Sequence, residues 1–154
     1  MNLSSLLTPE AVKVVSNATS KKRLLQTVGE LAHAAYGLDV SKTVKALQER
    51  ENLGPTGVGH GVALPHARIS SMENVVGTFI LLDNPVDFGA VDHLPVDLVF
   101  SLFAPTNAGV EHLKALALVS RTLRESSFCA KLRYNRDPAT LYAILTASQD
   151  TAVA

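Results

Sequence analysis

Two long apolar runs constrain the fold of this 154-residue chain more than any other feature. In residues 75–82 only Gly77 and Thr78 interrupt the apolar side chains, and residues 96–103 are nearly as continuous. Strands that are apolar on both faces are typical of a sheet covered by helices on each side. We therefore expect both runs to be central strands between two helical layers.

Helical patterns flank these two runs. Ser20 is a suitable N-cap for a helix over residues 21–36, which Gly37 would end. The other helices are expected from Asp39 or Ser41 to about 52, over about 107–124 and 127–134, and from Pro138 after a capping Asp137. Residues 11–15 are expected to form a strand, 83–85 a turn and 86–88 a minor strand. This order predicts the α/β class, as one three-layer domain over residues 1–154.

Composition narrows the class of function. Fourteen basic and fourteen acidic side chains cancel, so no broad surface for nucleic acid is predicted. The single cysteine, Cys129, cannot form an internal disulfide, which fits a reducing compartment. We expect its side chain in the core. The N-terminus lacks the pattern of a secretory signal, and no apolar stretch approaches the ~20 residues that span a bilayer. We expect a cytoplasmic protein with no membrane insertion.

A glycine-rich motif at mid-chain is the strongest candidate for a functional site. It contains three glycines at every second position, a short apolar run and a Pro-His pair: Gly57, Gly59, Gly61, residues 62–64, Pro65 and His66. Pro65 is expected to stop regular structure, and it fixes its own φ, so His66 should be held rather than free to swing. Arg68 lies two residues further on. A histidine held beside a guanidinium indicates a nucleophile with a neighbouring cation that can bind an anion.

Other interpretations of the motif have less support. A dinucleotide fingerprint needs glycines that open a helix after a strand, and a P-loop needs Gly-Lys followed by Ser or Thr; neither is present. His60 and His66 are six residues apart with no close Cys, Asp or Glu, so a zinc site is weakly supported. A lone histidine in a surface turn is usually an ordinary loop residue. Here the fixed Pro65, the nearby Arg68 and the clearance left by the glycines favour a site.

The motif and its surroundings resemble the enzyme IIA proteins of the phosphoenolpyruvate-dependent phosphotransferase system, of the fructose/mannitol type. The likeness is carried by residues 49–57 and 63–68, by residues 95–100, and by the helical Glu111-His112-Leu113. It extends over nearly the whole chain and keeps the order of the elements. The resemblance implies a single type 2 IIA domain, with an α/β/α architecture around a central mixed β-sheet.

The resemblance also implies a set of site residues. His66 would accept a phosphoryl group from a phosphohistidine on a small carrier similar to HPr, which makes the protein a phosphotransferase. Arg50 matches the phosphate-facing arginine of the family, and His112 matches its second active-site histidine. Without the family, Arg50 would be a solvated surface residue and His112 an exposed first-turn residue.

The chemistry suits these residue types. A neutral imidazole is nucleophilic near neutral pH, and a guanidinium fork matches phosphoryl oxygens, so no metal or cofactor is required. Weaker contacts with the phosphate or the partner are expected from further residues of the motif: Thr56, Gly57, Gly59, Gly61 and Arg68.

The sequences of residues 57–61 and 95–97 are similar to those of the nitrogen-regulatory branch of the family, and we expect a freestanding domain with no attached IIB or IIC region. That branch implies that the phosphorylation state of His66 is read by regulatory targets, such as potassium transporters or sensor kinases. Two alternatives stay open. One is a sugar-specific IIA component that passes phosphate to a IIB domain, and the other is a non-phosphorylated adaptor of the same fold.

Overall fold

The computed structural model describes the backbone of residues 1–153 and the side chains of residues 1–147. In this part of the chain six strands form one sheet, in the order β1-β5-β6-β3-β2, with β4 also paired to β6. The strands are β1 (Val12–Val15), β2 (Gly57–Gly59), β3 (Val62–Ala63), β4 (His66–Arg68), β5 (Val76–Val86) and β6 (Val96–Ala104). The pairs β1–β5, β3–β6 and β4–β6 are parallel, whereas β5–β6 and β2–β3 are antiparallel. The predicted mixed sheet is confirmed.

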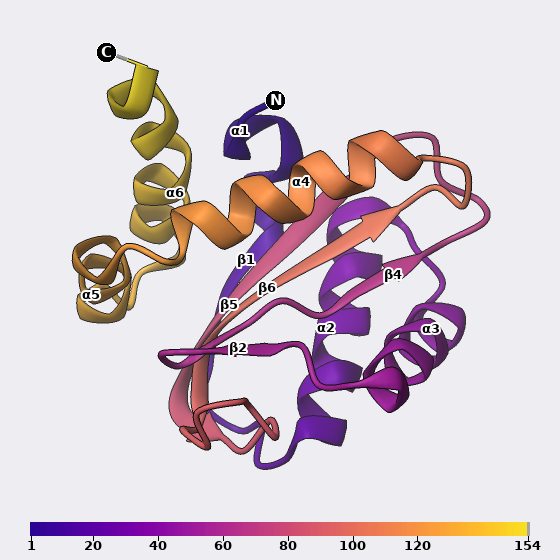
Figure 1. Ribbon diagram of the computed structural model, residues 1–154, viewed down its shortest axis with the longest axis horizontal. Coiled ribbons are helices and arrows are strands. Elements are labelled where there is room, and N and C mark those ends of the chain that lie inside the picture. The colour runs from indigo at the N-terminus through magenta and orange to yellow at the C-terminus, as the bar shows by residue number, and fades with distance from the viewer. Residues whose placement is uncertain (154) are drawn as a thin grey trace.

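Helices cover both faces of the sheet, as Figure 1 shows, with α4 across one face and α2 and α3 against the other. The helices are α1 (Leu3–Leu6), the 3-10 turn η1 (Pro9–Ala11), α2 (Lys21–Tyr36), α3 (Val40–Leu53), α4 (Gly109–Thr122), α5 (Ser126–Tyr134) and α6 (Pro138–Val153). Each face of the sheet has its own apolar cluster, and successive strand residues alternate between them: Phe79 and Leu81 belong to one, Ile80 and Leu82 to the other. The predicted three-layer arrangement is therefore correct. Among the described residues no helix has both the length and the apolar character of a membrane span.

The predicted helix ends follow from their caps. The Ser20 side chain accepts a hydrogen bond from the backbone N–H of Arg23, and Gly37 ends α2 in the left-handed conformation at φ 73°. Asp39 caps α3 in the same way through the N–H of Lys42.

The predicted turn at residues 83–85 and the minor strand at 86–88 are wrong. Strand β5 continues to Val86, and its register with β6 shifts between Leu81 and Val86. Proline has no N–H for a regular ladder, so it is found in sheets at such irregularities. Pro85 therefore marks a bulge in a continuing strand.

The segment that carries His66 runs along β6 in two pieces. Val62 and Ala63 pair with Leu98 and Val99, and after a break at Leu64 and Pro65 the segment pairs again from His66. The Pro65 carbonyl still accepts a hydrogen bond of 3.0 Å from Leu102 N–H. His66 therefore begins a strand instead of following the end of regular structure, and β6 holds the backbone on both sides of the break.

Candidate functional site

The ring of His66 is oriented by hydrogen bonds at both nitrogens. Nδ1 lies 2.9 Å from the carbonyl oxygen of Leu64, and Nε2 lies 3.2 Å from Nε of Arg50. A carbonyl only accepts and a guanidinium only donates, so Nδ1 carries the proton and Nε2 presents its lone pair. Burial lowers the pKa of His66 from 6.5; the Arg50 cation lowers it further, against the bond to Leu64. The neutral ring with a nucleophilic Nε2 is therefore the favoured form.

Arg50 reaches the site from the last turn of α3. A cation is favoured there by the carbonyl end of the helix dipole. Its Nη1 donates 2.9 Å to the Gly54 carbonyl just beyond the helix, and its Nε reaches His66. The fold thus brings together two residues that are sixteen positions apart. Arg50 is half-buried, not the solvated surface residue that the charged run alone would indicate.

His112 faces His66 from the first turns of α4. The two ring centroids are 5.5 Å apart, with 74° between the ring planes. His112 is only 5% exposed, so it is not the exposed first-turn residue that its place in the sequence alone would indicate. Its pKa is lowered from 6.5 to about 4, chiefly by burial and further by electrostatic interaction with the nearby His66 and Arg68. Its buried Nε2 has no hydrogen-bond partner within the described part of the chain.

A surface hollow of about 470 Å³ contains this group. Arg50, His66 and His112 line it together with Arg68, whose Nη1 donates 3.0 Å to the Thr106 carbonyl. Two apolar side chains on its rim are open to solvent: Leu53 is 85% exposed and Leu113 is 66% exposed. Neither leucine was predicted as a site residue from the sequence, although both lie close to predicted site residues in helix-terminal turns.

Thr56 is not among the residues that line this hollow. It is buried, and both its backbone N–H and its hydroxyl donate to the carboxylate of Glu51, the first over 3.1 Å. Lys21 completes the group with an ion pair of 2.8 Å to the same carboxylate. Glu51 was missed because it lies in a charged run, yet it follows Val44 and Leu47 at helical spacing, on the buried face of α3.

The three glycines of the motif lie away from His66, around the hairpin of β2 and β3. Gly59 and Gly61 have φ values of 99° and 79°, which disfavour any other residue. Gly57 leaves room for Ala90, whose Cβ would be 3.0 Å from a Cβ added at Gly57. The glycines therefore shape the hairpin and are not lining residues of the His66 hollow.

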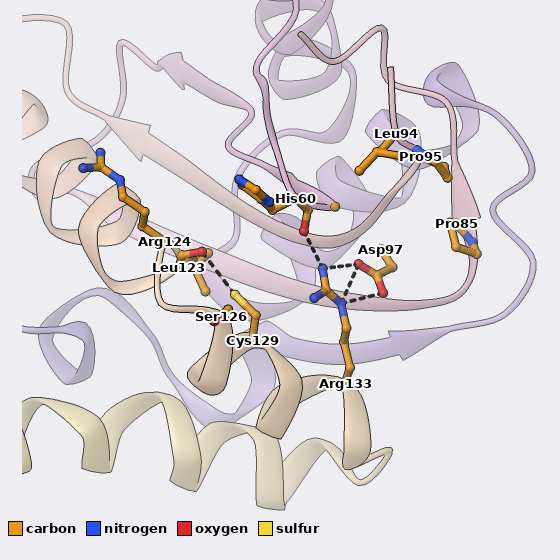
Figure 2. Close-up of a pocket in the computed structure, with 11 residues that line it drawn as sticks. His60, Pro85, Leu94, Pro95, Asp97, Leu123, Arg124, Ser126, Cys129 and Arg133 are labelled. Atoms are coloured by element: carbon orange, nitrogen blue, oxygen red, sulfur yellow. Dashed lines mark hydrogen bonds and ion pairs between the residues drawn. The ribbon is translucent and has the colours of Figure 1, made fainter. Parts of the chain in front are cut away.

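An ion pair fastens the same hairpin. Figure 2 shows the guanidinium of Arg133 between the carboxylate of Asp97 and the carbonyl of His60, beside a second hollow of about 440 Å³. A Cβ on Gly61 would lie 2.5 Å from Nη2 of Arg133. The glycine at position 61 therefore gives clearance to this ion pair.

The site can carry out nucleophilic and anion-binding chemistry. An oriented imidazole lone pair and two arginines share one hollow with a second histidine, which is the donor set that a transferred phosphoryl group needs. Within the described residues, no cluster of three or more His, Cys, Asp or Glu side chains is arranged to hold a metal ion.

Comparison with known families agrees with this geometry. The profile of the family described as "Phosphoenolpyruvate-dependent sugar phosphotransferase system, EIIA 2" matches residues 5–148. The chain therefore belongs to the type 2 enzyme IIA family of that phosphotransferase system.

Individual relatives point to one branch of the family. The chain is 41% identical over 152 residues to a nitrogen regulatory protein of Bradyrhizobium diazoefficiens, covering 99% of each chain. It is 36% identical to one of Escherichia coli K12, covering 98% of this chain and 93% of that protein. The crystal structure of the nitrogen regulatory protein IIA-Ntr from Neisseria meningitidis superposes with a TM-score of 0.85 at 35% identity, covering 92% of this chain and 97% of that one. The resemblance to the nitrogen-regulatory branch is confirmed.

Proposed function

We propose that this protein is a phosphocarrier that accepts a phosphoryl group on Nε2 of His66 from a phosphohistidine of an HPr-like carrier. The observation that supports it most is the pair of hydrogen bonds on the His66 ring. The N–P bond of the donor histidine breaks and its electron pair stays on the donor nitrogen, while the Nε2 lone pair of His66 forms the new N–P bond. The donor ring is protonated on its other nitrogen and leaves as a neutral imidazole. His66 keeps its Nδ1 proton on the bond to Leu64, and its ring takes up the positive charge, so no proton has to move between the two rings.

The neighbouring side chains stabilise the transferred group. Arg50 releases Nε2 and directs its guanidinium donors to the phosphoryl oxygens. The resulting hydrogen bonds are charge-assisted. His112 supplies the second contact. Its pKa of about 4 keeps it neutral in the free protein, and the charge of an incoming phosphoryl group raises that pKa and favours a donating N–H. Arg68 adds positive charge at the same hollow.

The rim of the hollow suits a protein donor. Exposed Leu53 and Leu113 flank the site, and exposed apolar side chains around a functional group are typical of protein interfaces. A carrier that docks on these leucines excludes water from His66 and strengthens the contacts of Arg50. We therefore assign the donor as a small protein and not as free phosphoenolpyruvate.

The modified state of His66 then acts as a signal in the cytoplasm. Phosphorylation adds about 1.5 to 2 negative charges at one hollow, enough to change which surfaces bind there. Relatives named nitrogen regulatory proteins support a regulatory output, and the proposed readers are regulatory targets such as potassium transporters or sensor kinases.

Labelling with a phosphorylated carrier tests the proposal. Wild-type protein and a His60→Ala variant should both take up label that is stable to alkali and lost in acid, and His66→Ala should take up none. His60 is a matched control because it is a histidine of the same motif outside the His66 hollow. Equal labelling of His66→Ala would overturn the assignment. Onward transfer to a IIB domain would support the sugar-specific alternative, and binding of targets by a wild type that takes no label would support the adaptor.

A further inference from the structure

We propose that Glu51 and Thr56 form a positioning clasp for His66 and Arg50. The "Glu51–Thr56 clasp" is the set of hydrogen bonds from the backbone N–H and hydroxyl of Thr56 to the Glu51 carboxylate. Neither Glu51 nor Thr56 lines the His66 hollow. The inference rests on the phosphocarrier function proposed above, and it assigns to Thr56 a role that acts through its neighbours.

The clasp is a buried and charged structure. Glu51 is 8% exposed and Thr56 is 5% exposed. A buried carboxylate is unfavourable unless its oxygens and charge are compensated. Here each oxygen accepts from Thr56, and the Lys21 ammonium lies 2.8 Å from Oε1. Lys21 is itself held by the Phe88 carbonyl at 3.3 Å and lies 4.5 Å from the centre of the Phe88 ring.

One arm of the clasp sets the position of Arg50. The chain between Glu51 and Thr56 is closed into a short loop, and Gly54 lies inside it, with its N–H bonded 3.1 Å to the Glu51 carbonyl. The Gly54 carbonyl accepts from Nη1 of Arg50. Because both ends of the loop are fixed, that carbonyl has a defined position and holds the guanidinium toward His66.

The other arm sets the ring of His66. The Thr56 carbonyl accepts a hydrogen bond of 3.0 Å from the N–H of Leu64, and the Leu64 carbonyl accepts from Nδ1 of His66. A continuous chain of bonds therefore runs from the Glu51 carboxylate through Thr56 and Leu64 to the imidazole. Thr56 is the junction of both arms, so its displacement loosens the nucleophile and its cation together.

Substitutions at Thr56 separate positioning from mere stability. Thr56→Val removes the hydroxyl at nearly constant shape, and Thr56→Ser keeps it. For Thr56→Val we expect phosphoryl transfer to slow about 10- to 100-fold per folded molecule, since small misplacements have effects of this size. The affinity for the carrier should stay at the wild-type value, because the clasp lies outside the hollow. Thr56→Ser should restore the transfer rate to within about twofold of wild type.

A second readout does not depend on phosphoryl transfer. The ¹⁵N chemical shifts of the neutral His66 ring report which nitrogen carries the proton. Wild type and Thr56→Ser should be almost entirely Nδ1–H, and Thr56→Val should show a measurable share of Nε2–H.

The control is Tyr36→Phe. It removes a half-buried hydroxyl that bonds the carbonyls of Leu6 and Gly77, in a part of the fold that the clasp does not reach. This variant should lower stability and leave both the transfer rate and the His66 tautomer unchanged.

The outcomes distinguish the two proposals. If wild type takes no phosphoryl group, the phosphocarrier function fails, and the tautomer measurement still decides on the clasp. If wild type is phosphorylated but Thr56→Val matches it in rate and tautomer, the clasp is overturned. Slowing in Tyr36→Phe equal to that in Thr56→Val would also overturn it, since a general loss of stability would then explain both.

Discussion

The reactivity of His66 depends on which of its ring nitrogens is already engaged. A backbone carbonyl accepts hydrogen bonds and never donates them, so the bond from Nδ1 to Leu64 fixes the tautomer as long as the backbone is held. Arg50 then meets the remaining lone pair. Burial, and after it the charge of Arg50, lowers the pKa of His66 and favours the neutral ring. Two hydrogen bonds thus set the direction of the proposed nucleophile, and its surroundings favour the neutral form.

Arg50→Met tests this role of the guanidinium. It removes the cation beside His66, so the pKa of His66 should rise, and a proton titration followed by NMR measures it. Phosphoryl transfer should slow about 100-fold, as after loss of one charge-stabilising donor. Lys114→Met is a suitable control, because Lys114 is exposed and pairs only loosely with Glu111 at 4.0 Å. A His66 pKa that is unchanged in Arg50→Met contradicts this role.

The buried His112 should make the free energy of unfolding depend on pH. Its pKa is about 4 in the folded protein and 6.5 in the unfolded chain, so the unfolded chain binds the proton first. The stability that the neutral, buried imidazole of His112 contributes is therefore present above pH 6.5 and is lost as the pH falls toward 4. We expect it to amount to about 2 kcal/mol, because the open hollow screens part of the effect.

Denaturant titrations of wild type and His112→Gln at about pH 7 and about pH 4.5, on either side of the unfolded-chain pKa, measure that contribution. The carboxylates titrate in both proteins and cancel in the comparison, so wild type should lose more stability between the two pH values than the variant. Equal losses would show that the imidazole does not titrate as described.

Only part of this site could be predicted from the sequence. His66 follows from Pro65, because local backbone rules act on neighbouring residues. The glycines drew attention to the motif, but they shape the hairpin and do not line the His66 hollow. Arg50 and His112 lie far from it in sequence, and only a family resemblance connects them. Helical spacing places Glu51 on the buried face of α3, but its ion pair with Lys21 depends on how α2 and α3 lie together, so the clasp could not be found from the sequence.

Among the secondary-structure elements, the broken strand β3–β4 places the site. Its two pieces pair with one strand, β6, and the break at Leu64 and Pro65 frees the Leu64 carbonyl for the His66 ring. The hairpin before it is fastened separately by Asp97 and Arg133, with the Gly61 position crowded against both side chains.

Gly61→Ala should therefore destabilise the protein, by about 2 kcal/mol, through a left-handed φ of 79° and a clash with the ion pair. Gly109→Ala is the matched control. Gly109 begins α4 with nothing within 4 Å of an added Cβ, so alanine should be neutral or stabilise by up to about 1 kcal/mol. Chemical denaturation of both variants measures the difference, and equal stabilities would refute the crowding at Gly61.

At the scale of the whole molecule, the sheet separates two apolar clusters. The candidate site lies between α3 and α4, which belong to opposite faces of the sheet. The helices were predictable because their caps are local. The extent of β5 was not, because a bulge that absorbs Pro85 depends on pairing with β6. The order of the strands is likewise a property of distant pairing.

The most direct test of the central claim is an NMR spectrum of the phosphorylated protein with ¹⁵N-labelled histidine. We predict a single phosphohistidine at His66, with the phosphoryl group on Nε2 and the proton retained on Nδ1. Phosphorylation at Nδ1 of His66, or at any other histidine, would contradict the claim.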